Sequence, residues 1–195
     1  MTPSPSPSPP SSPRNGWLQT YYSTRAAVSV AWILLAVTVG QAAPLVGAVL
    51  LVLYPAWDAA ANYLDAAKTG GLRANPSQAL NLAVSLLTAL AVAAAVLTRA
   101  FPVLLVFGVW AVLSGGFQLA TGVGRWRLGG QWAMVLSGTQ SVLAGAFFVK
   151  MAGTAPGSVV AVIAPYVGFG AFYFLVSAIW LSVKARRAQG SALPG

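Results

Sequence analysis

The stretch SQALNLAVSLLTALAVAAAVLT, residues 77–98, carries no charged side chain and consists largely of Leu, Ala and Val. A helix needs roughly 20 apolar residues to cross the hydrocarbon core of a bilayer. Charged residues flank the stretch at Arg73 and Arg99. This segment therefore predicts a membrane-spanning helix.

The composition of the whole chain fits the same environment. Hydrophobic residues make up 57% of the 195 residues and charged residues 7%, with a mean hydropathy of +0.75; both fractions are far from those of soluble globular proteins. A net charge of +9 suggests nucleic-acid binding at first. The basic residues stand singly or in small groups between apolar runs, however, as in the flanks of membrane spans. We therefore expect a lipid bilayer and no nucleic acid as partner.

The chain contains no Cys and no His. This excludes thiol nucleophiles, Ser–His–Asp triads, disulfides and the usual zinc sites. Asp58 and Asp65 are its two acidic residues. We expect no metal, no cofactor and no enzymatic activity, because these two carboxylates leave little for acid–base or metal chemistry.

Six apolar runs are long enough to span a bilayer. They cover residues 22–41, 44–67, 77–98, 101–123, 130–151 and 157–183, within one transmembrane domain at 21–187. The Pro/Ser-rich residues 1–20 predict a disordered tail, because such a segment buries too little apolar surface to fold. Residues 188–195 predict a short flexible C-terminal tail. The fold class that follows is an all-α membrane protein with six transmembrane helices.

The distribution of basic residues predicts the orientation, since cytoplasmic loops hold the excess of Lys and Arg. With six spans, one side holds Arg14, Arg25, Lys68, Arg73, Arg125, Arg127, Lys184, Arg186 and Arg187. The other side holds only Arg99 and Lys150. This bias predicts a protein of the cell membrane with both termini in the cytoplasm.

An internal repeat is visible in the prolines. Pro44, Pro102 and Pro156 each stand at the turn that opens an even-numbered span. The repeat predicts three consecutive helical hairpins in one orientation, with pseudo-threefold character.

A gapless alignment supports the repeat. Residues 54–70 (YPAWDAAANYLDAAKTG) lie over residues 107–123 (FGVWAVLSGGFQLATGV). The alignment matches Trp57 to Trp110 and Asp65 to Gln118. A third copy, around residues 164–174, matches more loosely.

This layout resembles the bacterial HdeD-type family of short-repeat membrane proteins of unknown function. The resemblance covers roughly residues 25–187 and is carried by YPAWDAAANYLDA (54–66), GGLRANPSQALN (70–81), GRWRLGGQWAMVLSGTQSVLAGAFF (124–148) and FGAFYFLVSAIW (169–180). These stretches look like actinobacterial members. The resemblance implies a role in acid resistance or stress response, and it carries over no catalytic residue.

The candidate site lies in the second span, where Asp58, Asn62 and Asp65 fall on one helical stripe. Asp58 is near mid-membrane, where a carboxylate costs about 2.5 to 3.5 kcal/mol, so it should face the bundle interior. Its side chain is either a proton or cation relay or a hydrogen-bonded packing residue. Candidate partners are Gln118, which completes the proposed polar site, and Gln140, Asn81, Tyr22 and Arg25. Asp65 can pair with Lys68 or Arg73.

Two further local patterns predict structure. Asn75-Pro76-Ser77-Gln78 reads as a helix start, with Asn75 as N-cap and Gln78 reaching back as in a capping box. Small residues form two helix-packing faces, suited to contacts within the monomer and also to a homo-oligomer. These faces are Gly116/Ala120/Gly124 and Ser137/Ser141/Gly145.

Three hypotheses about function remain open. The first is a non-enzymatic membrane bundle for acid or stress tolerance or membrane homeostasis. The second is a small proton or cation channel or transporter that uses Asp58, and the third is a structural partner of another membrane protein. The sequence indicates no small-molecule ligand.

Overall fold

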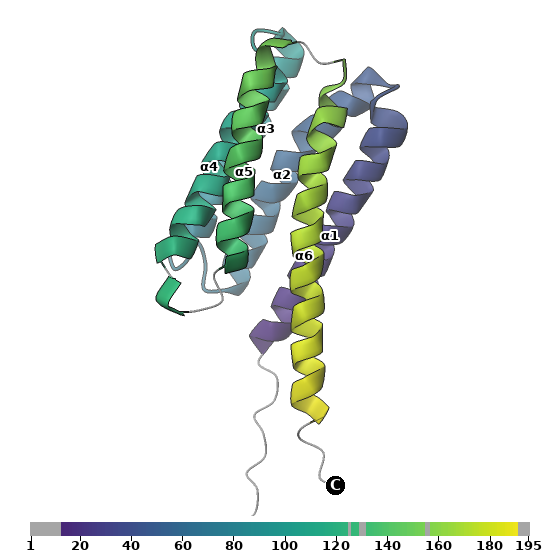
Figure 1. The fold of residues 1–195 in the computed structure, drawn as a ribbon. Helices are drawn as coiled ribbons and strands as arrows, with labels where there is room; N and C mark the ends of the chain where they lie inside the picture. The colour runs from purple at the N-terminus through teal and green to yellow at the C-terminus, as the bar shows by residue number, and fades with distance from the viewer. Residues whose placement is uncertain (1–12, 125, 129–131, 155–156, 191–195) are drawn as a thin grey trace, which may run out of the picture.

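The protein folds as six long helices in the computed structural model, which describes residues 13–124, 126–128, 132–154 and 157–190 (Figure 1). These are α1 (Pro13–Leu35), α2 (Pro44–Lys68), α3 (Pro76–Thr98), α4 (Val103–Gly124), α5 (Trp132–Met151) and α6 (Val159–Gly190). A π-helical segment, η1 (Ala36–Gly40), extends α1, and the 3-10 turns η2 (Trp126–Leu128) and η3 (Ala152–Thr154) follow α4 and α5. No strand occurs within these ranges.

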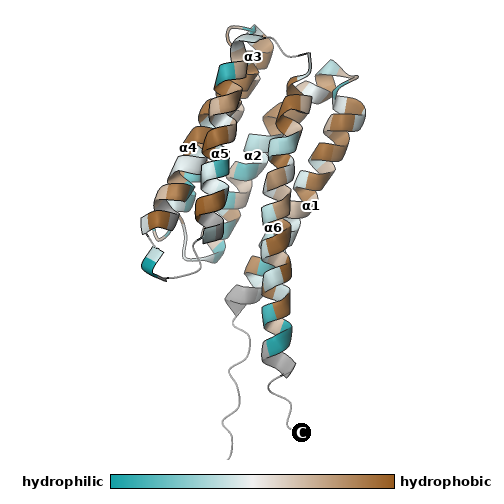
Figure 2. Ribbon diagram, viewed as in Figure 1, coloured by the Kyte–Doolittle hydropathy of each residue, from teal (hydrophilic) through white to brown (hydrophobic). Residues whose placement is uncertain are grey.

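Each of the six helices is long and apolar enough to cross a membrane. The outer surface is apolar as well: Leu45 and Leu97 are 78% and 83% exposed, and Figure 2 shows hydrophobic residues along all six helices. A surface of this kind is suited to acyl chains and would drive association in water. The prediction of an all-α, six-span membrane protein is confirmed.

The first helix begins earlier than the sequence indicated. α1 starts at Pro13, so residues 13–20, which we expected in the disordered tail, are helical. Trp17 explains part of this extension, because its indole Nε1 donates to Asp65 Oδ1 of α2 at 3.2 Å. Residues 1–12 of the expected tail lie outside the described residues.

The last helix ends later than predicted. α6 continues to Gly190, beyond the expected end of the span at residue 183. Near its end the Gln19 amide of α1 donates to Ser182 Oγ at 2.8 Å, which joins the first and last helices. The remainder of the expected C-terminal tail, residues 191–195, lies outside the described part of the chain.

The helices form a closed ring in chain order, because α6 packs back onto α1. Close and loose contacts alternate around this ring. The close pairs are α2/α3, α4/α5 and α6/α1, whereas α1/α2, α3/α4 and α5/α6 touch less, although a short connection joins each of them. We call these three looser contacts the intra-hairpin seams. The alternation is the arrangement that three hairpins around a pseudo-threefold axis produce.

Glycines allow α4 and α5 to make the most extensive contact in the bundle. A Cβ on Gly115 would lie 2.7 Å from the Gly138 carbonyl oxygen, and a Cβ on Gly145 would lie 2.6 Å from that of Gly108. The two backbones therefore touch at positions where no side chain fits.

The predicted packing faces take part in this contact unequally. Ser141 and Gly145 of the α5 face lie against α4. On α4, the predicted Gly116 and Gly124 face open space, and Gly115 makes the contact instead. A shift of one residue turns a helix face by about 100°, so Gly116 and Gly124 do not make the α4 contact within the monomer. A homo-oligomer through either face stays a prediction.

A repeat of 56 residues links the three hairpins. Buried serines occupy α1, α3 and α5 at intervals of 56 residues, and rings with a polar atom follow each of them 25 residues later on α2, α4 and α6. The serines are Ser29, Ser85 and Ser141, and the rings are Tyr54, Trp110 and Tyr166.

Each serine pairs with the ring of its own hairpin. Trp110 Nε1 donates to Ser85 Oγ at 3.0 Å, and the hydroxyls of Ser141 and Tyr166 lie 2.9 Å apart. In the first hairpin the Tyr54 hydroxyl lies close to Ser29, in the corresponding place. The three hairpins therefore repeat an internal contact as well as a topology.

The register of this repeat corrects the alignment made from the sequence. That alignment matched Trp57 to Trp110 and Asp65 to Gln118, a shift of 53 residues. In the structure Trp110 takes the place of Tyr54, three residues away. A slip of three residues is close to one helical turn and preserves the apolar face, so small and aliphatic sequences match almost equally well in both registers.

α3 begins where the sequence predicted, but the side chains of Asn75 and Gln78 do not form the predicted capping hydrogen bonds. Asn75 stands at the N-cap position without a capping side-chain hydrogen bond. Its amide donates to the carbonyl oxygens of Thr69 and Gly71, at 3.0 and 2.9 Å, and so closes the preceding loop. Gln78 donates to Asp65. The capping-box prediction is wrong, because the amides of Asn75 and Gln78 donate to other acceptors and no side chain caps the helix.

Candidate functional site

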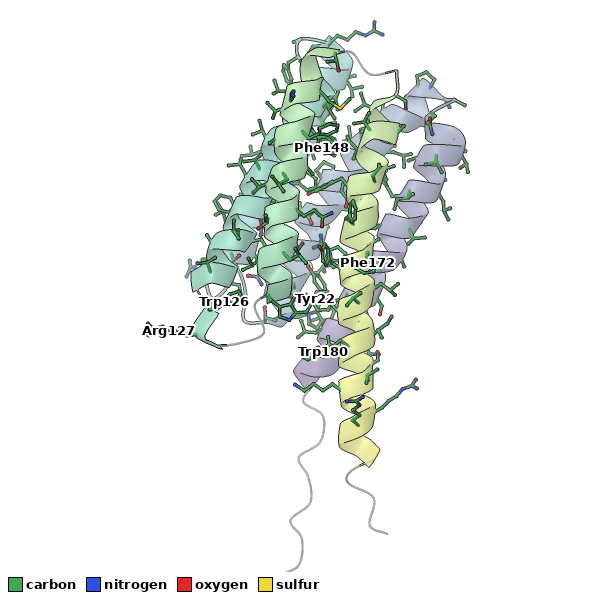
Figure 3. The ribbon with its side chains drawn as sticks, viewed as in Figure 1. Tyr22, Trp126, Arg127, Phe148, Phe172 and Trp180 are labelled. Atoms are coloured by element: carbon green, nitrogen blue, oxygen red, sulfur yellow. The ribbon has the colours of Figure 1, made fainter. Side chains whose placement is uncertain are left out.

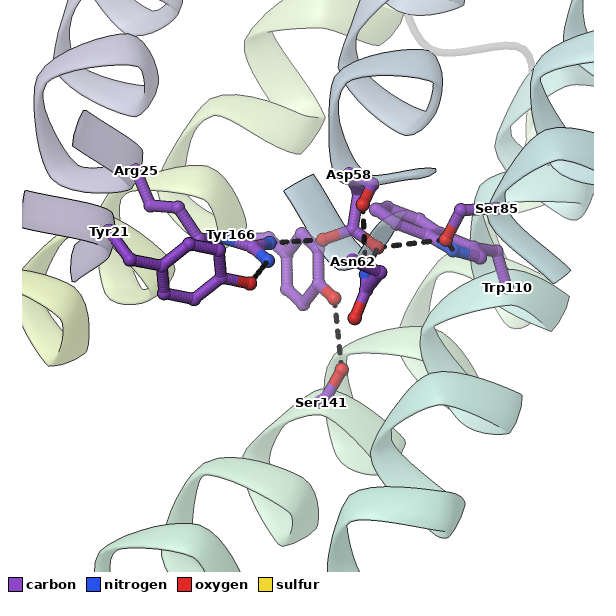
Figure 4. A network of polar contacts seen from close by, with 8 residues as sticks. All are labelled: Tyr21, Arg25, Asp58, Asn62, Ser85, Trp110, Ser141 and Tyr166. Atoms are coloured by element: carbon purple, nitrogen blue, oxygen red, sulfur yellow. Dashed lines mark hydrogen bonds and ion pairs between the residues drawn. The ribbon is translucent and has the colours of Figure 1, made fainter. Parts of the chain in front are cut away.

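Asp58 lies inside α2, ten residues before Lys68 and about 15 Å from it along the helix. Its side chain is 16% exposed. A carboxylate at this depth in a bilayer needs a counter-charge or several hydrogen bonds to remain ionised. The structure supplies both (Figure 4).

Three side chains from three helices engage the Asp58 carboxylate. Arg25 of α1 forms an ion pair with Oδ1. Asn62, one turn further along α2, donates to Oδ2 at 3.0 Å, and Ser85 of α3 donates to the same oxygen at 2.8 Å. Both carboxylate oxygens therefore have partners, which lowers the cost of burying the charge.

The network continues from Ser85 into the fourth helix. The Trp110 indole Nε1 of α4 donates to Ser85 Oγ at 3.0 Å. Ser85 is 0% exposed and Trp110 4% exposed, so these bonds form away from lipid and solvent. Hydrogen bonds in such a chain strengthen one another in a low-dielectric interior. The result is a connected path across α1, α2, α3 and α4.

Aromatic rings surround the Arg25 guanidinium. Its carbon Cζ lies 4.4 Å from the ring centroid of Phe174 on α6 and 5.6 Å from that of Tyr21. Arg25 Nη1 also donates to the Tyr21 hydroxyl at 2.9 Å. Stacking and charge pairing together hold the guanidinium in an apolar setting. Its Nε is buried and has no hydrogen-bond partner among the described residues.

Asp65 belongs to a separate contact near the end of α2. Trp17 donates to Oδ1 at 3.2 Å, and Gln78 of α3 donates to Oδ2 at 3.1 Å. Neither Lys68 nor Arg73 forms an ion pair with it within the described residues. Lys68 instead places its Nζ 5.7 Å from the ring centroid of Trp17. Asp65 thus joins α1, α2 and α3 through neutral donors.

The repeated rings meet at the centre of the bundle. Tyr54 and Trp110 pack edge to face with centroids 5.9 Å apart, and Trp110 and Tyr166 do so at 6.4 Å. Ser141, which pairs with Tyr166, also donates to the Ala111 carbonyl oxygen at 3.1 Å. The three even-numbered helices therefore bring side chains together where a central pore would run.

Aromatic side chains also gather toward one end of the bundle. In Figure 3, Tyr22, Trp126 and Trp180 lie toward the end that carries the Arg127 loop. Lys184 Nζ lies 5.3 Å from the ring centroid of Trp180. This pattern is typical of the interface between the hydrocarbon core and the lipid headgroups.

No family model, curated protein or solved structure matches this sequence.

The four predicted site residues are only partly brought together. Asn62 donates to Asp58 Oδ2, whereas the Asp65 carboxylate accepts from Trp17 and Gln78. No hydrogen bond joins Gln118 to either carboxylate in the described part of the chain. Among the other candidate partners, Arg25 contacts Asp58, while Gln140 accepts a hydrogen bond from Tyr173.

Sequence reasoning missed Ser85, Trp110 and Tyr21 as members of the network. A signal for two of them was present, because Ser85 and Trp110 belong to the 56-residue pattern of serines and polar rings. The signal for Tyr21 was its position one helical turn before Arg25, on the same face.

The arrangement is suited to fixing helices in place. Arg25, Asn62 and Ser85 together donate to both carboxylate oxygens of Asp58. Arg25 and Ser85 come from α1 and α3, the two helices beside α2 in the ring. Among the described residues, no group of three or more His, Cys, Asp or Glu side chains stands together to hold a metal ion. Movement of a proton through Asp58 would first require separation of the Arg25 ion pair.

Proposed function

We propose that the protein is a non-enzymatic membrane bundle that serves acid or stress tolerance or membrane homeostasis, and that the Asp58 network acts in it as a structural clamp. The resemblance to the HdeD-type family supports the physiological part of this proposal. The contacts of Asp58 support the structural part, because Asp58 is paired with Arg25 and accepts hydrogen bonds from Asn62 and Ser85.

Two further observations favour a clamp over a conduit. The rings of Tyr54, Trp110 and Tyr166 occupy the centre of the ring of helices. The glycine contact between α4 and α5 closes another route between helices. A channel that used Asp58 would need a hydrated path along one of these directions.

The proposal includes an orientation, with both termini on the cytoplasmic side of the cell membrane. α1 begins and α6 ends at the same end of the bundle as the α2–α3 and α4–α5 connections (Figure 1). That end carries Lys68, Arg73 and Arg127. An excess of Lys and Arg is the usual mark of a cytoplasmic face.

Two paired measurements test the proposal. Purified protein in liposomes should conduct protons and potassium no faster than protein-free liposomes, for both the wild type and Asp58→Asn. Bacterial cells that express the wild-type chain should survive an acid shift better than cells with the empty vector. A proton flux that Asp58→Asn abolishes would replace the clamp with a transport function, and unchanged survival would remove the tolerance role.

A further inference from the structure

A hollow of 480 Å³ lies on the surface of α6, in the half of the helix away from its basic end. Phe169 and Phe172 are 54% and 59% exposed, so the hollow opens away from the bundle. Because α6 is long and apolar enough to cross a membrane, the hollow faces acyl chains. Its lining is Pro165, Gly168, Phe169, Phe172 and Tyr173.

One side of α6 leads from this hollow to the basic end of the helix. Phe169, Val176, Trp180 and Arg187 stand at i, i+7, i+11 and i+18, positions that share one side of an α-helix. Val176 and Trp180 are exposed. In Figure 3, Phe172 lies nearer the middle of the bundle and Trp180 nearer the basic end. These residues form an apolar track between the hollow and the interface.

The length of this track matches one leaflet of a bilayer. Trp180 stands eight residues after Phe172 and eleven after Phe169, which is about 12 and about 17 Å along the helix. Half of a hydrocarbon core is about 15 Å thick. Tryptophan is enriched at the headgroup level. With Trp180 at that level, the hollow lies at the depth where the acyl chains of the same leaflet end.

A positive charge is held at the headgroup end of the track. Lys184 is exposed one turn after Trp180, and its Nζ lies 5.3 Å from the centroid of the indole ring. The attraction of an ammonium to the face of an aromatic ring steadies the lysine side chain. An ammonium has three N–H donors. Among the described residues these donors have no carboxylate partner, so they are available to the oxygen atoms of a ligand.

The acidic side chains of the chain lie elsewhere. Asp58 and Asp65 both belong to α2, where side chains of α1 and α3 donate to them. Arg186 adds a second exposed positive charge two residues after Lys184. At the headgroup level of a bilayer, a lipid of net negative charge supplies the missing counter-charge.

We propose that this side of α6 binds one anionic phospholipid. Its phosphate accepts a hydrogen bond from Lys184 Nζ beside Trp180. One acyl chain lies along Val176 and ends in the hollow at Phe169 and Phe172. This inference goes beyond the proposed function, since the liposome flux and the acid survival do not depend on it.

Native mass spectrometry of the full chain in detergent tests this site, with dioleoyl phosphatidylglycerol and dioleoyl phosphatidylcholine as probes. Lys184→Ala removes the positive charge beside Trp180. Its matched control is Lys150→Ala, which removes an exposed lysine from the last turn of α5, at the opposite end of the bundle. Phe172→Ala removes one wall of the hollow, and Phe147→Ala removes an exposed phenylalanine of α5 outside it. All four side chains are exposed, so the variants should keep the fold.

The wild type should retain one phosphatidylglycerol about fivefold more tightly than phosphatidylcholine, the effect of one lysine near an anionic headgroup. Lys184→Ala should lose this preference, whereas Lys150→Ala should keep it. Phe172→Ala should retain both lipids severalfold more weakly than the wild type, whereas Phe147→Ala should retain them equally well.

Equal retention of the two lipids by the wild type, or equal effects of Lys184→Ala and Lys150→Ala, would overturn the anionic headgroup site. Equal effects of Phe172→Ala and Phe147→Ala would overturn the acyl-chain site in the hollow. A dimer that retains no lipid and that Phe172→Ala dissociates would assign this side of α6 to a second copy of the chain instead.

Discussion

At the scale of single residues, the ion pair of Arg25 and Asp58 has the largest energetic consequences. Each side chain is less than one fifth exposed, at 13% and 16%. A buried pair is costly to assemble, but removal of one partner leaves the other charge buried without compensation. The two residues should therefore depend strongly on each other.

We expect Asp58→Ala to lower the free energy of unfolding by about 3 kcal/mol, because Arg25 loses its counter-charge. The double variant Arg25→Leu with Asp58→Ala should lose at least about 1 kcal/mol less than the sum of the two single variants, since residues in contact are coupled. Equilibrium unfolding in mixed detergent micelles measures both values. Additive losses would show that the pair does not act as a unit.

The two serines Ser85 and Ser114 provide a second test at this scale. Ser85 donates to Asp58 and accepts from Trp110, so Ser85→Ala should cost about 1 to 3 kcal/mol of unfolding free energy. Ser114 has a buried hydroxyl without a partner in the described residues, so Ser114→Ala should cost little or stabilise the protein. The same unfolding titration compares them. Equal losses for the two variants would contradict the assignment of Ser85 to the network.

At the scale of helices, the α4/α5 contact depends on backbone approach. A Cβ on Gly115 would lie 2.7 Å from the Gly138 carbonyl oxygen and 2.9 Å from the Val142 nitrogen, so Gly115→Ala must push the two helices apart. The adjacent Gly116 has nothing within 4 Å, and Gly116→Ala is the matched control.

Gly115→Ala should lower the midpoint of thermal unfolding in detergent by several degrees, because overpacking costs about 1 to 3 kcal/mol. Gly116→Ala should leave it unchanged or raise it slightly, since Ala favours helix over Gly. If the two variants unfold at the same temperature, the close α4/α5 contact is not a determinant of stability.

The helices themselves were the most predictable part of the structure. Uninterrupted apolar runs such as 77–98 and the prolines at the turns determined the number of spans and most of their ends. The start of α1 was not predictable, because it depends on the contact of Trp17 with Asp65, a residue 48 positions away. The register of the repeat was missed because a three-residue slip leaves an apolar helix face almost unchanged.

At the site, the sequence predicted the contacts within one helix but not those between helices. A carboxylate at the depth of Asp58 required a partner, and Asn62 lies one turn away on the same helix. The choice of Arg25 from five candidates, and the roles of Ser85 and Trp110, depend on which helices are neighbours in the ring. The partners of Asp65 also depend on which helices are neighbours: it accepts hydrogen bonds from Trp17 and Gln78 and not from the nearby basic residues.

At the scale of the whole molecule, three related hairpins close into a ring, and the Arg25–Asp58 ion pair lies in the first. The positions of Arg25 and Asp58 become Asn81 and Ser114 in the second hairpin, and Ser137 and Gly170 in the third. At these two positions charge thus occurs in the first hairpin alone, while the contacts between serines and rings occur in all three. The ring architecture does not require the charge, and the clamp is a specialisation of the first hairpin.

The absence of cysteine makes labelling of single introduced thiols the most direct test of the central claim, that the Asp58 network is a closed clamp without a hydrated path. In liposomes, Ser85→Cys should resist a small charged methanethiosulfonate reagent supplied on both sides and react fully after denaturation. Ala100→Cys, at an exposed turn, should react at once. Rapid labelling of Ser85→Cys in the folded protein would reveal water at the network and contradict the account.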